Sequence, residues 1–160
     1  MIREINRDDI VQCANVIRES FITVAHEFGF TEDNASRFTA FATTTERLDW
    51  HLNGEHRSMY GYFDDNKLVG YYSLLLQDNQ ECELNNLCVL PEYRHRKIGY
   101  ILLDNAFDNA RKMNCKKMNI GIVEENQVLR KWYEKYGFVH IGIKKYDFFP
   151  FTCGYMFKVL

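Results

Sequence analysis

A strand that leads directly into a helix is the feature that most constrains this fold, and it lies between Leu87 and Leu103. The apolar strand ends at Pro91, and an apolar helical rhythm begins after Gly99. Three cationic side chains occupy the connection: Arg94, Arg96 and Lys97. A helix that starts here presents unpaired backbone N–H groups and the positive end of its dipole, so the junction predicts a site for a phosphate or pyrophosphate. A solvated basic turn before an ordinary helix is the alternative interpretation.

Length and composition indicate one globular domain spanning residues 1–160. Hydrophobic residues make up 46% of the 160 positions, and the net charge of −2 argues against nucleic acid as a partner. No apolar run reaches the roughly 18 residues of a membrane span, and the N-terminus lacks the apolar core of a signal peptide. We therefore expect no membrane association and a cytoplasmic location. The five histidines and five cysteines show no metal-ligand spacing, so no metal site is expected.

The order of predicted elements favours a mixed α/β domain. Strands are predicted at residues 2–5, 59–63, 68–76, 81–90, 117–123, 138–143 and 153–159. Helices are predicted from Asp8 or Asp9 to about Phe28, at 99–113 and at 127–136, with an irregular helical region at 33–50 that breaks around Thr43 to Thr45. The three consecutive strands with short polar turns indicate an antiparallel meander, and the helix at 99–113 is a crossover between strands.

A second informative segment runs from Asn126 to Phe138. Asn126 follows a strand and is a good helix cap, and Tyr133 lies seven residues further, on the same helical face. Gly137 ends the helix and Phe138 begins the next strand. Taken alone, the segment is better explained by Asn126 as a simple cap and Tyr133 as a core residue than by a functional site.

Together the two segments resemble the GNAT superfamily of acyl-CoA-dependent N-acyltransferases. The first matches the acyl-CoA loop Q/R-x-x-G-x-G/A of that family, from Arg94 to Gly99, and the second matches N-x-x-x-x-x-x-Y-x-x-x-G-F, from Asn126 to Phe138. The loop departs from the pattern at Lys97, where the family has its middle Gly. A lysine here can still donate its N–H if its φ is negative, and its ammonium adds positive charge, so we expect CoA binding to be retained.

The resemblance covers essentially the whole chain and implies the family's fold. That fold has a central, mostly antiparallel sheet of about six to seven strands flanked by about four helices. The sheet is expected to splay between the strand that ends at Leu90 and the strand at 117–123.

The resemblance also implies acetyl-CoA as the co-substrate. Its pantetheine arm is expected to pair with the splayed strand and its pyrophosphate with backbone N–H groups of the loop. The residues expected to bind it are Leu87, Cys88, Val89, Arg94, His95, Arg96, Lys97, Ile98, Gly99, Tyr100 and Asn126. Tyr133 is expected to act as the general acid that protonates the departing thiolate. A backbone N–H of the splayed strand, that of Val89, is expected to polarise the thioester carbonyl.

The implied reaction is transfer of the acetyl group to a primary amine of a small-molecule or peptide acceptor, by a monomer or homodimer. A non-catalytic acyl-CoA-binding or regulatory module is the alternative. The acceptor is expected to contact the N-terminal helices, the turn at 77–80 and the aromatic segment at 146–151.

The sequence leaves the identity of the general base undecided among three options. Glu83 is the first choice, because it shares a strand face with Glu81 and Leu87 unless a bulge intervenes. Glu124 and a water relay are the other options.

Overall fold

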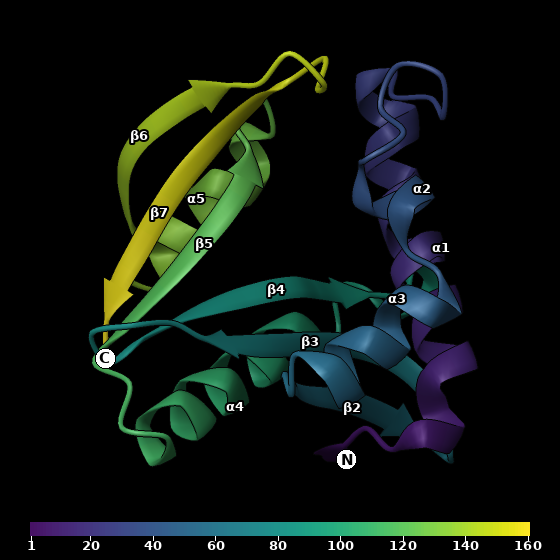
Figure 1. Ribbon diagram of the computed structural model, residues 1–160, viewed down its shortest axis with the longest axis vertical. Coiled ribbons are helices and arrows are strands. Elements are labelled where there is room, and N and C mark those ends of the chain that lie inside the picture. Colours follow the sequence, from purple (N-terminus) through teal and green to yellow (C-terminus); the bar gives the residue numbers. More distant parts are fainter.

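One seven-stranded sheet runs through the computed structural model, which describes residues 1–160 (Figure 1). Its strands are β1 (Ile2–Glu4), β2 (Ser58–Asp64), β3 (Lys67–Leu76), β4 (Glu81–Val89), β5 (Lys117–Val123), β6 (Val139–Lys145) and β7 (Thr152–Val159). They are ordered β1-β2-β3-β4-β5-β7-β6, and β4 with β5 is the one parallel pair. The predicted mixed α/β class with a mostly antiparallel sheet is confirmed.

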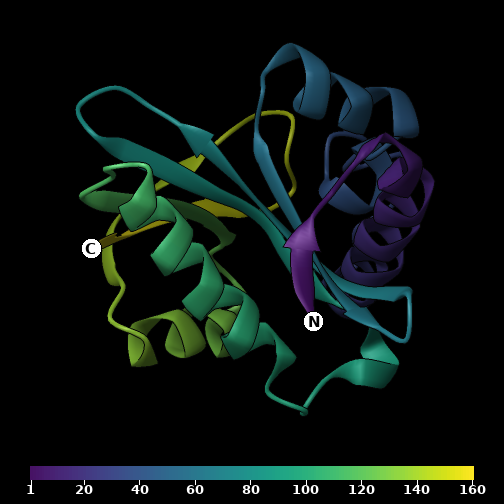
Figure 2. The ribbon, with the colours of Figure 1, turned by 90° about the horizontal axis from the view of Figure 1, so that it is seen from below.

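Helices cover both faces of the sheet (Figure 2). They are α1 (Ile10–Phe28), α2 (Thr39–Ala42), α3 (Thr45–Asp49), α4 (Ile98–Lys112) and α5 (Gln127–Lys135). The first three lie on one face and α4 and α5 on the other, so the sheet has a core on each side. None of the helices combines the length and the apolar character needed to cross a lipid bilayer.

The start and end of α1 follow from local chemistry. The Asn6 side chain accepts a hydrogen bond from the Asp8 N–H at 2.9 Å, and Asp9 Oδ2 accepts one from the Asn6 N–H at 2.9 Å. This capping box opens a short 3-10 turn that continues into the helix. Gly29 ends α1 with a φ of +74°, a conformation that glycine adopts without steric cost.

The region predicted as an irregular helix from residue 33 is only partly helical. Residues 33–38 form turns, because Thr31 and Asn34 bond each other's backbone N–H at 2.8 and 3.2 Å and so compete with helix formation. The expected break is present, since Thr43 and Thr44 separate α2 from α3. The Thr44 hydroxyl caps α3 by accepting from the Arg47 N–H at 3.1 Å.

The sheet splays between β4 and β5, as expected. Their pairing is limited to Glu81–Glu83 against Lys117–Asn119. Beyond these residues β4 stays with β3, whereas β5 follows β7, and the two halves diverge as a wedge in Figure 1. The rest of β4 therefore has an open edge toward β5.

A β-bulge lies in this open part of β4. Tyr71 of β3 is opposite Cys88, but Ser73 is opposite Asn85, so two steps along β3 match three along β4. Asn86 absorbs the extra residue with a φ of +56°, which asparagine tolerates better than most residues.

The bulge corrects one expectation about the general base. Cys88 and Glu83 both lie opposite odd-numbered residues of β3, Tyr71 and Leu75, so they share the face covered by α1. Leu87 neighbours Cys88 and points to the other face. Glu83 and Leu87 therefore do not share a face, because the inserted residue reverses the alternation.

Candidate active site

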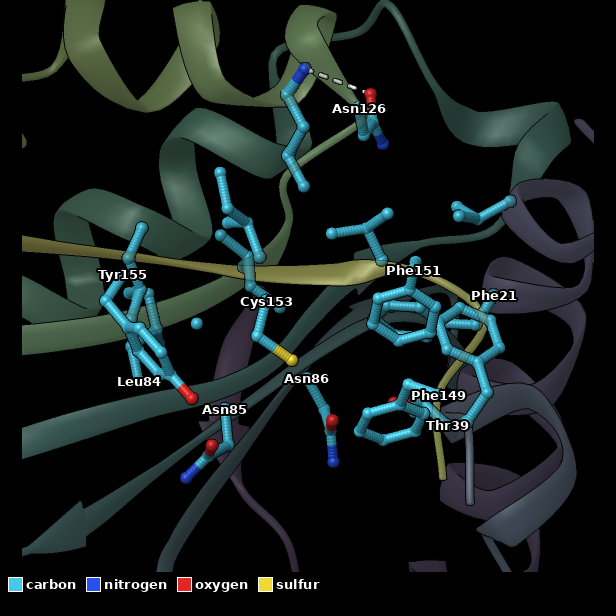
Figure 3. A pocket seen from close by; sticks show the side chains of 18 of the residues that line it. Phe21, Thr39, Leu84, Asn85, Asn86, Asn126, Phe149, Phe151, Cys153 and Tyr155 are labelled. Atoms are coloured by element: carbon cyan, nitrogen blue, oxygen red, sulfur yellow. Dashed lines mark hydrogen bonds between the residues drawn. The ribbon is translucent and has the colours of Figure 1, made fainter. Parts of the chain in front are cut away.

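A cavity of about 300 Å³ occupies the wedge between β4 and β5. Its walls come from β4 (Glu83 to Leu87), β5 (Ile120 to Val123) and α5 (Asn126, Leu129, Tyr133). Figure 3 shows the rings of Phe21, Phe149 and Phe151 gathered together, and the amides of Asn85 and Asn86 projecting from β4. The cavity thus brings together four of the predicted site residues: Glu83, Leu87, Asn126 and Tyr133.

Tyr133 is buried on the α5 side of this cavity, with 6% of its surface exposed. The rings of Trp132 and Phe138 meet it edge-on at 5.1 and 5.2 Å and fix its orientation. Burial raises the pKa of the phenol above its usual value near 10. Its hydroxyl makes no hydrogen bond within the protein, so Tyr133 is a neutral donor available to a ligand.

Asn126 lies where β5 gives way to α5. Its Oδ1 caps α5 by accepting from the Leu129 N–H at 3.2 Å (Figure 3). The amide NH₂ has no partner within the protein and borders the cavity. The expected cap and the expected ligand contact are therefore compatible, because they use different atoms of one side chain.

The connection from β4 to α4 forms a cradle of backbone donors. The N–H groups of His95, Arg96 and Lys97 make no hydrogen bond within the protein, and the first bonded N–H of the helix is that of Ile101, at 2.9 Å from the Lys97 carbonyl. The N–H groups of the first helical turn are likewise free. Such a run of donors at a helix N-terminus suits a phosphate oxygen.

Lys97 departs from what we expected of its backbone. Its φ is +64°, and His95 has a φ of +63°. Lys97 thus keeps the left-handed conformation that favours glycine, although it carries a side chain. The negative φ that we set as the condition for donation by the Lys97 N–H is therefore not observed.

Arg94 makes two hydrogen bonds within the protein. Its Nε donates to the Val89 carbonyl at 3.2 Å and its Nη2 to the Ser20 carbonyl at 2.9 Å. These bonds hold the half-buried guanidinium between β4 and α1. Arg96 and Lys97 are exposed and supply the free positive charge of the loop.

The start of α4 packs closely against α5. A Cβ at Gly99 would lie 3.6 Å from the Trp132 ring and 3.9 Å from Val89 Cγ2, so a larger side chain would fill the gap between α4, α5 and β4. Tyr100 stacks on Tyr136 at 4.8 Å, while Ile98 is buried and anchors the helix. Ile98 and Gly99 can reach a ligand only through backbone, which agrees with their expected role.

Cys88 is buried on the α1 face of the sheet and is not one of the residues that line the cavity. Burial raises the pKa of its thiol to about 12. Only the backbone of Cys88 can contribute to the open edge of β4, together with that of Leu87 and Val89.

The carboxylates near the site have distinct surroundings. Glu83 is the one acidic residue that lines the cavity, and its Oε2 accepts from Gln77 at 3.2 Å. Glu124 is held by Arg130 at 2.9 Å and His140 at 2.8 Å and does not line the cavity. Glu81 is engaged by Lys117 at 3.3 Å. The geometry therefore favours Glu83 over Glu124 as a proton acceptor.

Several lining residues escaped the sequence reasoning: Arg37, Asn85, Asn86 and Tyr155. Two adjacent asparagines in an apolar strand are a recognisable signal for a bulge. No local pattern distinguishes Arg37 or Tyr155, because the fold brings them in from opposite ends of the chain. The aromatic segment and the N-terminal helices line the cavity as expected, but the turn at 77–80 does not.

Comparisons with known proteins agree with this geometry. The chain is 35% identical over 144 residues, covering 86% of each protein, to the spermidine N(1)-acetyltransferase of Thermoplasma acidophilum. It is 23% identical over 114 residues, 71% of this chain and 75% of the other, to a putative ribosomal protein bS18 alanine N-acetyltransferase of Bacillus subtilis.

The fold agrees as well. The crystal structure of the PaiA N-acetyltransferase from Thermoplasma acidophilum in complex with coenzyme A superposes with a TM-score of 0.81 at 24% identity, covering 100% of this chain and 98% of that one. The acetyltransferase (GNAT) family matches residues 21–138, which include both predicted motifs and the splayed strands. The chain therefore belongs to the GNAT family of acetyltransferases.

Proposed function

We propose that this protein transfers an acetyl group from acetyl-CoA to a primary amine, with Tyr133 and Glu83 as the groups that move protons. The observation that supports this most strongly is their common cavity at the splay, where β4 also leaves its edge open. A neutral phenol and a carboxylate in one cavity suit a reaction that must both remove and supply a proton.

The co-substrate would lie along the open edge of β4. The backbone of Leu87, Cys88 and Val89 would pair with the pantetheine arm, and the amide of Asn126 would contact it from α5. The N–H groups from His95 to Tyr100 would hold the pyrophosphate. Because each hydrogen bond to a charged group contributes roughly 1.5–3 kcal/mol, these donors can bind without a dominant side chain.

Two proton transfers accompany the exchange of one bond for another. The amine nitrogen bonds to the acetyl carbonyl carbon, and the bond from that carbon to sulfur breaks. Glu83, directly or through water, takes the proton that the amine must lose. Tyr133 gives a proton to the departing thiolate, and the N–H of Val89 polarises the carbonyl.

Replacing Tyr133 by Phe tests the proposal. The hydroxyl matters when charge builds on sulfur, so Tyr133→Phe should lower kcat about 10²-fold and change KM for acetyl-CoA little. Tyr136→Phe, one helical turn further along, is the matched control and should keep wild-type turnover. An unchanged kcat in Tyr133→Phe, with chemistry limiting the rate, would assign Tyr133 to packing alone. If the protein binds acetyl-CoA but releases no CoA in the presence of any amine tested, it is a binding module and not an enzyme.

A further inference from the structure

A second cavity of about 160 Å³ adjoins the first on the side of α3. The two cavities share four lining residues: Arg37, Thr39, Asn85 and Asn86. Thr39 and both asparagines are labelled in Figure 3, at the edge of the first cavity away from α5. A ligand whose amine approaches Glu83 can therefore extend past Asn85 and Asn86 into the second cavity.

The second cavity is strongly cationic. Arg37, Arg47 and Arg57 line it, and no carboxylate does. Arg57 is paired with Glu55 at 3.3 Å, but Arg37 and Arg47 form no ion pair. Arg37 is held over the Phe148 ring at 4.2 Å, an arrangement that leaves the edge of the guanidinium free to donate hydrogen bonds. Two positive charges are thus uncompensated.

Two buried polar atoms in the lining also lack partners. His51 has only 7% of its surface exposed, and its Nδ1 makes no hydrogen bond. The Nδ2 of Asn85 is a buried donor without an acceptor. Buried polar atoms in native proteins almost always find a partner. Both residues line a cavity whose charged side chains are arginines, and this lining favours a polar ligand group that is negative.

We infer that the acceptor is an amine that also carries a carboxylate or a phosphate, with the amine in the first cavity and the anion in the second. This inference rests on the proposed function, since it names the class of acceptor for the same site. Arg37 and Arg47 are then specificity-determining residues. A polyamine is excluded as the preferred acceptor, because its second ammonium would lie among the arginines, where like charges repel.

The test compares amines of matched length and different charge. We expect 4-aminobutyrate and 3-aminopropylphosphonate to have kcat/KM values at least tenfold above n-butylamine, and putrescine to be the poorest of the four. The ratio between the first two distinguishes a carboxylate from a phosphate preference. Wild-type protein that acetylates putrescine or n-butylamine as well as the two anionic amines would overturn the inference.

Substitutions of the arginines test whether the preference for anionic amines comes from the second cavity. Arg37→Gln and Arg47→Gln should each lower kcat/KM for the anionic amines about tenfold relative to n-butylamine, chiefly through KM, and Arg47→Gln, which lies outside the first cavity, should leave n-butylamine unchanged. Arg111→Gln is the control, because Arg111 is exposed on α4, on the opposite face of the sheet. Equal losses for charged and neutral amines would also contradict the assignment.

A binding measurement separates the inference from the proposed reaction. Calorimetry on the CoA-saturated protein should show tighter binding of 4-aminobutyrate than of n-butylamine, and Arg47→Gln should remove the difference. If this holds while no amine is acetylated, the anion site stands and the proposed transfer fails. If putrescine is acetylated preferentially, the transfer stands and the inference fails. If none of the anionic amines binds, the inference is overturned.

Discussion

The guanidinium of Arg94 donates to the carbonyl of Ser20 at 2.9 Å and thereby ties the connection between β4 and α4 to α1. The same side chain also bonds the carbonyl of Val89 at 3.2 Å, on the splayed strand. Because α1 carries Phe21 into the cavity wall, one side chain links the β4–α4 connection to a helix that lines the cavity.

Removing this link should affect stability as well as binding. Arg94→Ala loses two charge-assisted hydrogen bonds, so we expect the free energy of unfolding to fall by about 2 kcal/mol in urea denaturation. Arg96→Ala should change it by less than about 0.5 kcal/mol, since Arg96 is exposed and contacts only the Tyr93 ring, at 5.0 Å.

Ligand binding should separate the same two variants. Arg96→Ala should weaken CoA and leave a pantetheine analogue without phosphates unaffected, whereas Arg94→Ala should weaken both, because it displaces β4 and the loop. Equal losses for the two ligands in Arg96→Ala would show that the exposed cation does not act on phosphate.

The left-handed backbone of Lys97 predicts a stabilising substitution. Lys97→Gly should raise the free energy of unfolding by about 0.5–1 kcal/mol, because glycine adopts a φ of +64° without the clash of a Cβ. Arg96→Gly is the matched control and should lower the free energy of unfolding. Arg96 has a negative φ, so glycine relieves no strain there and only increases the conformational entropy of the unfolded chain. Thermal and urea unfolding measure both. A destabilised Lys97→Gly protein would mean that the Lys97 side chain makes a compensating contact.

Glu83 and its strand neighbour Glu81 allow a paired test of the general base. Glu83→Gln should lower kcat at neutral pH by about 10²-fold, and the loss should shrink at higher pH, where solvent deprotonates the amine. Glu81→Gln removes a carboxylate from the same face, but one that is engaged by Lys117, and should keep kcat near wild type. Equal turnover in the Glu83→Gln and wild-type proteins would direct the search to a water relay.

His51 predicts how stability depends on pH. Burial, followed by the charges of Arg57 and Arg47, lowers the pKa of His51 to about 4, against the opposing effect of Glu55. An unfolded histidine titrates near 6.5, so between these values the unfolded state binds more protons. The free energy of unfolding should therefore fall as pH drops from about 6.5 to about 4, by roughly 3 kcal/mol at most.

Urea unfolding across this pH range measures the effect. His51→Gln should flatten the decline, while His26→Gln, at an exposed position of α1, should keep it. A decline that persists unchanged in His51→Gln would assign the acid sensitivity to another group.

Local sequence patterns determined much of this protein. The relation between Asn126 and Tyr133 depends only on the helical repeat, and the junction between Leu90 and α4 depends only on where a strand stops and a helix begins. The mostly antiparallel sheet and its splay followed from the family resemblance, and the structure agrees with both. These features could be predicted because each is encoded by neighbouring residues or by a motif of fixed spacing.

Long-range packing decided the rest. The bulge at Asn86 places Glu83 and Leu87 on opposite faces, and the register against β3 fixes its position. The partner of Arg94 lies 74 positions away in the chain, and the arginines of the second cavity come from α3 and the segments around it. Such contacts depend on how separate elements dock, which local propensity does not specify, so only the tertiary structure could assign the anion site and the role of Arg94.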